Sequence, residues 1–183
     1  MRCGFKYFEL VTFGILMLNG LSQIRLIDSL KLALKNAQHD TTSLELLLTL
    51  GELEGISRIN YWDSLTQSSI KLANKYKKKS AEYLSIKRVQ ANSLNNFAYF
   101  NMQQGMIPKA IIFYNQALNL SEEIHYDNGI ATALGSIGFI YQAQNEMDKA
   151  IEYFVKAKRL MFKINNLHGL AGCLKIWQLH MNH

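Results

Sequence analysis

The chain repeats a stretch of its own sequence at a fixed spacing. The segment QGMIPKAIIFYNQALNL ends at Leu120, and the similar segment QNEMDKAIEYFVKAKRL ends at Leu160, 40 positions later. Self-similarity at a period of this size is typical of solenoids and other arrays, in which each unit packs mainly against its neighbours. Because one unit cannot bury its own apolar face, the repeat predicts that stacked copies build a continuous core.

Alignment of residues 91–120 with residues 131–160 shows which positions the repeat preserves. Eight positions are identical without any gap: Ala91/Ala131, Leu94/Leu134, Gln104/Gln144, Lys109/Lys149, Ala110/Ala150, Ile111/Ile151, Ala117/Ala157 and Leu120/Leu160. A third copy begins at the same spacing, where Gly129, Ala131 and Leu134 recur as Gly169, Ala171 and Leu174. The array therefore extends beyond the two clearest copies.

Each copy predicts two helices. In the second copy, apolar residues recur three and four positions apart on both sides of Asn145 and Glu146, which interrupt the pattern. In the first copy Gly105 occupies this turn, and Pro108 lies in the first turn of the following helix, where its missing N–H costs little. No segment shows the period-two alternation of a half-buried strand, and Pro occurs once in 183 residues. The sequence therefore predicts an all-α protein.

Small and large residues recur at fixed places in the two copies and predict how the helices pack. Two small residues allow the helices of one hairpin to approach closely, an aromatic ring fills the gap, and a further alanine makes room for the next copy. These residues are Ala98, Ala110, Tyr114 and Ala117 in the first copy, and Gly138, Ala150, Phe154 and Ala157 in the second.

This pattern resembles the tetratricopeptide repeat family, in which a large residue, Leu-Gly and Tyr precede Ala, an aromatic residue and Ala on a second helix. The second copy fits well, whereas the first has Asn101 where the family has Tyr. The family's period is about 34 residues. The additional residues here fall in SEEIHYDNG and MFKINNLHG, so the second helix of each copy is expected to be longer. The resemblance implies an α-α superhelical solenoid of helix hairpins.

The resemblance divides the chain into segments. Residues 80–125 and 126–165 are expected to be tetratricopeptide repeats, and residues 41–79 a degenerate one, with Leu50-Gly51 on its first helix and Asp40, Thr41 or Thr42 as its N-cap. Residues 23–40 are expected to form an N-terminal capping helix. Residues 166–183 begin another first helix without a second, which fits either a capping helix or a truncated product, such as a frameshift after Leu174.

Residues 1–22 have the three-part pattern of a secretory signal peptide. Arg2 and Lys6 precede an apolar run from Leu10 to Leu21, and Gly20 and Ser22 are spaced for cleavage before Gln23. The run has 12 residues, whereas a membrane-spanning helix needs roughly 20. Cleavage predicts a periplasmic or cell-envelope protein; an uncleaved anchor is the competing interpretation, and a cytoplasmic location the alternative.

No constellation of residues in the sequence predicts catalysis, a metal site or a cofactor. His180 and His183 are three apart but have no third ligand nearby, and Glu52 and Glu54 lie on different faces of their predicted helix. Cys173 would be alone once the signal is removed, and it is expected to be a small apolar filler. The chain is therefore expected to act by binding and to have no enzyme activity of its own.

The formal net charge is +6, and part of the excess lies in the segment KYKKKSAEYLSIKR, between Lys75 and Arg88. Such a run can contact nucleic acid or anionic lipid, but it more often forms a solvated helix end. No RNA-binding or recognition-helix motif accompanies it.

The resemblance implies that the first helices of the repeats line a concave groove for a protein or peptide. By the family's spacing, the candidate partner-binding residues are Asn92, Asn95, Tyr99, Met102, Gln103, Thr132, Phe139 and Gln142. Tyr99 and Phe139 could instead pack between neighbouring helices. The groove lysines with which some members grip a C-terminal carboxylate are missing, because the matching positions hold Asn95, Tyr99, Gly135 and Phe139.

The order of signal peptide, capping helix and long-period repeats is also similar to the exported sensory regions of Bacteroidetes-type sensor histidine kinases. That similarity implies an exported interaction module of a signal-transduction system, without the kinase part. The alternative is a cytoplasmic repeat regulator, or a fragment of a transcription regulator, that contacts nucleic acid through the basic segment.

Overall fold

The computed structural model describes residues 23–54 and 59–164. These residues form helices joined by short turns, and no strand occurs among them. The chain divides into two compact units, residues 1–56 and residues 57–183. The boundary lies inside the predicted degenerate repeat 41–79, and the secretory signal and the C-terminal segment 166–183 lie outside the described residues.

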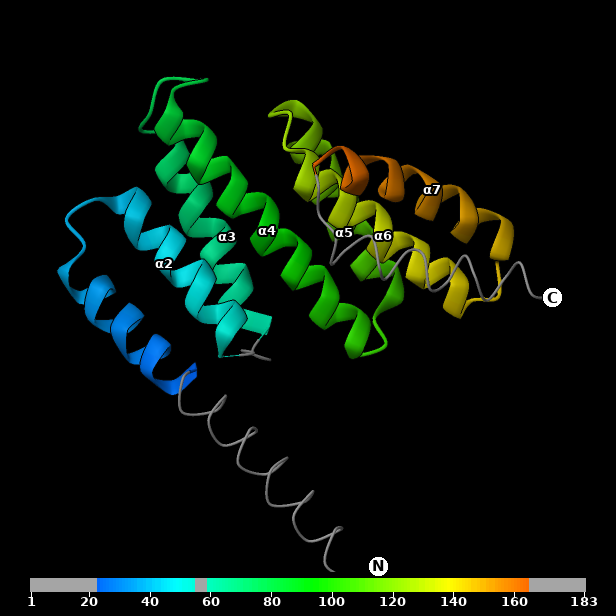
Figure 1. Cartoon of the computed structure of the whole chain (residues 1–183), viewed down its shortest axis with the longest axis horizontal. Coiled ribbons are helices and arrows are strands. Elements are labelled where there is room, and N and C mark those ends of the chain that lie inside the picture. The colour runs from blue at the N-terminus through cyan, green and yellow to red at the C-terminus, as the bar shows by residue number, and fades with distance from the viewer. Residues whose placement is uncertain (1–22, 55–58, 165–183) are drawn as a thin grey trace, which may run out of the picture. The chain divides into compact units, whose positions relative to one another are not determined.

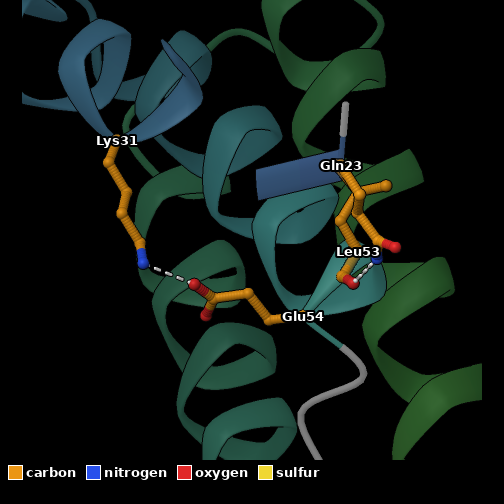
Figure 2. A network of polar contacts seen from close by, with 4 residues as sticks. All are labelled: Gln23, Lys31, Leu53 and Glu54. Carbon is orange, nitrogen blue, oxygen red and sulfur yellow. Dashed lines mark hydrogen bonds and ion pairs between the residues drawn. The ribbon is translucent and has the colours of Figure 1, made fainter. Parts of the chain in front are cut away.

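The described part of the first unit is a pair of helices, the segment 23–36 and α2 (Asp40–Leu53). The start of one meets the end of the other: the Gln23 side-chain Nε2 donates to the Leu53 carbonyl at 2.9 Å, and the Lys31 ammonium lies 2.6 Å from the Glu54 carboxylate (Figure 2). The hydrogen bond to Glu54 raises the pKa of Lys31. Since Lys31 is solvent-exposed, the ion pair orients the helices more than it stabilises them.

The predicted N-cap of α2 was wrong by at least one residue. The helix begins at Asp40, and His39 takes the N-cap position with an extended backbone (φ −112°, ψ 132°) and no capping hydrogen bond from its side chain. Asp40 instead lies in the first turn, where its carboxylate interacts favourably with the helix dipole. Leu50 and Gly51 lie on α2 as predicted, and both are buried.

The described part of the second unit contains α3 (Ile59–Ala73), α4 (Ala81–Gln103), α5 (Ile107–Glu123), α6 (Asp127–Ala143) and α7 (Met147–Lys163). Each helix packs against the next along the chain, and α4 also contacts α6. The helices lie side by side as successive hairpins (Figure 1). This arrangement confirms the predicted all-α solenoid of helix hairpins, with α4–α5 inside the expected repeat 80–125 and α6–α7 inside 126–165.

Three successive helices end in the same way, which explains the period of the repeat. A residue in the left-handed region follows each helix: Gly105 (φ 74°), His125 (φ 53°) and Asn145 (φ 63°). The next N–H donates to a carbonyl five residues earlier: Met106 to Asn101 (2.9 Å), Tyr126 to Ser121 (2.8 Å) and Glu146 to Tyr141 (2.9 Å). This is the Schellman motif, which satisfies the last carbonyls of a helix.

The three left-handed residues are 20 positions apart, and α5, α6 and α7 each have 17 residues. A period of 40 therefore consists of two equal units, each a 17-residue helix and a three-residue turn. The predicted lengthening of the second helix is confirmed only in part: α5 continues to Glu123, but α6 begins at Asp127, so the additional residues are shared between the two helices. The predicted turns at Gly105 and Asn145 and the place of Pro108 in the first turn of α5 are also confirmed.

The predicted pattern of small and large residues forms the core of the second unit. Tyr114 is 1% exposed and packs with Ala98 and Ala110 of its own hairpin and with Ile137 and Ile140 of the next. Burial raises the pKa of the Tyr114 phenol to about 12, so the ring stays uncharged in the core.

Phe154 has the same role in the second hairpin, where it packs with Ala131, Leu134 and Ala157. A Cβ at Gly138 would lie 2.9 Å from the Phe154 ring, so the absence of a side chain there admits the ring. The packing predicted for this hairpin is therefore also confirmed.

Among the described residues, no helix has both the length and the apolar character that crossing a bilayer would require.

Candidate protein-binding surface

The candidate partner-binding residues lie in two rows on adjacent helices. Those of α4 follow one face by helical spacing, and so do those of α6. Since α4 and α6 contact each other, the fold brings the two rows together. The α4 row holds Asn92, Asn95, Tyr99, Met102 and Gln103, and the α6 row holds Thr132, Phe139 and Gln142.

Two aromatic side chains provide the largest exposed apolar groups of these rows. Tyr99 is 45% exposed and Phe139 is 46% exposed, at equivalent positions of the two repeats. The Tyr99 ring packs edge-on against Phe100 at 5.4 Å between centroids, and the Phe139 ring against Phe154 at 5.1 Å. Each ring is thus held by a neighbour on one side and open to solvent on the other. The Phe139 contact joins α6 and α7, as the packing alternative expects, whereas the Tyr99 contact lies within α4.

The polar members of the rows differ in exposure. Gln103 and Thr132 are exposed, while Asn92, Met102 and Gln142 are half-buried. Thr132 donates to the Asn128 carbonyl at 2.9 Å. Asn95 is 5% exposed, and its side-chain amide makes no hydrogen bond within the described structure. An unpaired buried amide costs about 1–3 kcal/mol. Asn95 therefore lies beneath the surface rather than on it, whereas the other seven residues are exposed or half-buried.

A residue that the sequence did not single out extends this surface. The Tyr126 hydroxyl accepts hydrogen bonds from the side-chain amides of Asn92 (3.3 Å) and Asn128 (3.5 Å). The Arg88 guanidinium lies 5.8 Å from the centre of the Tyr126 ring. An open hollow of about 430 Å³ is lined by Arg88, Tyr126, Asp127, Asn128 and Ile164. Tyr126 was missed because it lies in the turn between repeats, which sequence comparison treats as additional length.

The basic segment is divided between two environments. Lys75, Lys77, Lys78 and Lys79 are exposed in the turn between α3 and α4. Lys87, on α4, donates to the Gln90 side chain at 3.0 Å and lies 5.6 Å from the Tyr83 ring centre. The turn lysines therefore form an exposed basic patch just before α4.

Within the described ranges, no group of three or more His, Cys, Asp or Glu residues is placed to hold a metal ion. His125 has a conformational role, because it adopts the left-handed conformation that ends α5. Cys3, Cys173, His168, His180 and His183 lie outside the described residues.

Comparison with known proteins agrees with this architecture. The crystal structure of BtubC (BKLC) from P. vanneervenii superposes with a TM-score of 0.60 at 18% sequence identity; the match covers 82% of this chain and 62% of that chain. At this identity the likeness concerns the fold alone. A search of curated proteins found no significant match.

A family comparison identifies the repeats directly. The tetratricopeptide repeat family matches residues 89–161, which extend from within α4 to near the end of α7. Such repeats generally mediate protein–protein interaction and are typically not catalytic. Residues 89–161 of this all-α solenoid therefore match the tetratricopeptide repeat family.

Proposed function

We propose that this chain is a protein-binding module whose partner lies across α4 and α6 and is anchored by Tyr99 and Phe139. The observation that carries the proposal is the exposure of these two rings, 45% and 46%, at equivalent positions of adjacent repeats. Aromatic residues are enriched among the few that dominate binding energy. Since each ring is already packed against a neighbour, partner binding costs little additional side-chain entropy.

The chemistry of the surface restricts the kind of partner. Its side chains are aromatic, amide, hydroxyl and thioether groups, with no lysine or arginine in either row. A partner is therefore recognised through apolar side chains and backbone hydrogen bonds within its sequence, rather than through a C-terminal carboxylate.

Photo-crosslinking can identify the partner and test the surface. A photoreactive phenylalanine analogue at exposed Thr132 is expected to crosslink a discrete partner in lysate of the source organism, whereas the same group at Ile112, 56% exposed on α5, is not. With the partner purified, Phe139→Ala should weaken binding by at least about tenfold, because anchor residues typically contribute more than 1 kcal/mol. Ile112→Ala should leave the affinity unchanged. Equal effects of the two substitutions would contradict the proposal.

We further propose that the module is exported to the periplasm or cell envelope and belongs to a signal-transduction protein. Support comes from the signal-peptide pattern of residues 1–22 and from the similarity of the segment order to exported sensory regions. N-terminal sequencing of protein from the cell-envelope fraction is expected to begin at Gln23. Cytosolic protein with an intact Met1 would overturn export and favour the cytoplasmic regulator, with nucleic acid at the basic segment as its ligand.

A further inference from the structure

Arg88 continues the row of candidate partner-binding residues on α4. Tyr99 follows Arg88 by 11 positions, which is about three turns at roughly 3.6 residues per turn, so the two side chains lie on one face of the helix. Asn92 lies between them on the same face, one turn from Arg88. On α6, Asn128 occupies the position equivalent to Arg88, 40 residues later, and precedes Thr132 by one turn. Arg88 and Asn128 therefore extend the two rows by one turn each.

The two extensions meet at Tyr126, which orients Arg88. The Tyr126 hydroxyl accepts hydrogen bonds from the side-chain amides of Asn92 (3.3 Å) and Asn128 (3.5 Å), so one amide from each row holds the ring. The Arg88 guanidinium lies 5.8 Å from the centre of this ring, and a cation is attracted to the electron-rich face of an aromatic ring. Arg88 is thus restrained before any partner binds, which reduces the side-chain entropy that binding costs.

The free charge of the hollow beside Tyr126 is positive. Of the residues that line it, Arg88 and Asp127 are charged. The Asp127 carboxylate lies 2.7 Å from the Lys163 ammonium and is therefore already paired. Arg88 is exposed and makes no ion pair with any residue in the described ranges. A guanidinium presents its N–H donors in a planar fork that matches the two oxygens of a carboxylate.

We infer that Arg88 binds the carboxylate of an aspartate or glutamate in the same protein partner that Tyr99 and Phe139 anchor; the inference rests on the proposed function. The length of α4 between Arg88 and Tyr99 gives the spacing in the partner. Eleven helical residues measure about 16 Å at roughly 1.5 Å per residue, and an extended chain spans this distance in about five residues. The partner segment therefore has an acidic residue about five positions from the apolar residue that contacts Tyr99.

The surroundings of Arg88 favour an acidic protein segment over a nucleic acid. A nucleic acid binds through several phosphates, each neutralised by a cation. The two rows beside Arg88 hold no second lysine or arginine, and the neighbouring Lys87 contacts Gln90 and the Tyr83 ring instead. One carboxylate needs one cation, and the aromatic and amide groups of the rows suit the rest of a peptide.

Short random peptides displayed on phage are the probes that test this inference. Selection on the full chain is expected to enrich sequences that have an apolar residue and an Asp or Glu about five positions apart. Selection on Arg88→Glu should enrich Lys or Arg at that place instead. Because Arg88 is exposed, this substitution is expected to leave the fold intact. A selection that enriches no sequences, or sequences with the same charge preference for both proteins, would overturn the inference.

A double-mutant cycle with one selected peptide measures the ion pair. Arg88→Gln should weaken binding by about two- to fivefold, and replacing the peptide's acidic residue by Ala should have the same effect. The two changes together should weaken it no further, because either one removes the pair. Arg159→Gln, the same change of charge at an exposed position of α7, should leave the affinity unchanged. Additive losses, or an equal loss in Arg159→Gln, would contradict the pairing.

Two further measurements separate this inference from its alternatives. Inorganic phosphate should displace the peptide no more than sodium chloride of equal ionic strength; stronger displacement would identify a phosphate site and overturn the carboxylate assignment. Phe139→Ala should weaken the peptide by at least about tenfold. Binding that needs Phe139 but not Arg88 would overturn the inference and leave the proposed function standing. Binding that is independent of Phe139 would overturn both.

Discussion

Phe154→Ala is expected to lower the free energy of unfolding by about 3–5 kcal/mol, the usual cost of removing a buried aromatic ring. Phe154 is 5% exposed and packs among small residues that leave space for its ring, including Gly138. Neither Gly138 nor Ala150 has a side chain that could move into the space, so the cavity would remain largely open. The loss is measured from urea unfolding followed by circular dichroism.

Phe162→Ala provides the matched control, because it removes the same ring from the same helix. Phe162 is 76% exposed, and its replacement is expected to change the stability by less than about 0.5 kcal/mol. If the two substitutions had similar effects, the orientation of α7 and the core proposed for the second hairpin would both be wrong.

Trp62→Ala is expected to cost a similar amount, about 3–5 kcal/mol. Trp62 is 1% exposed on α3, and its ring stacks on Phe100 of α4 at 6.2 Å between centroids with 14° between the ring planes. This substitution tests whether α3 folds together with the repeats. The family match does not address α3, because α3 precedes the matched residues 89–161. A loss of this size in a single cooperative transition would show that α3 folds with the array.

Trp62→Phe is the control for this second prediction. It keeps an aromatic ring against Phe100 and should cost clearly less than Trp62→Ala. If Trp62→Ala instead produced a separate early transition and left the main transition unchanged, α3 would be an independent unit.

The local features of the repeat were predictable from sequence because each depends on neighbouring residues. Pro108 marked the start of α5, and Gly105 and Asn145 marked turns because they readily adopt positive φ. The N-cap of α2 was not predicted correctly, since Asp40, Thr41 and Thr42 all favour that position and the backbone selected His39 instead.

The exposure of individual side chains was less predictable. Asn95 and Tyr99 belong to the same row by helical spacing, yet one is 5% exposed and the other 45%. Tyr126 was invisible to repeat alignment because its partners, Asn92 and Arg88, lie 34 and 38 positions away in the sequence. In each case the difference arises from which helices meet at that point, and residue spacing along one helix carries no such information.

By itself, the sequence determined that this chain is an array of paired helices with a 40-residue period, because periodicity, turn residues and the alternation of small and large side chains act over short distances. The tertiary structure alone decided which side chains of a row are buried and which are exposed, as Asn95 and Tyr99 show. The space that the Tyr114 ring fills is bounded by side chains of α4, α5 and α6 at once. The volume between elements depends on every side chain that borders it.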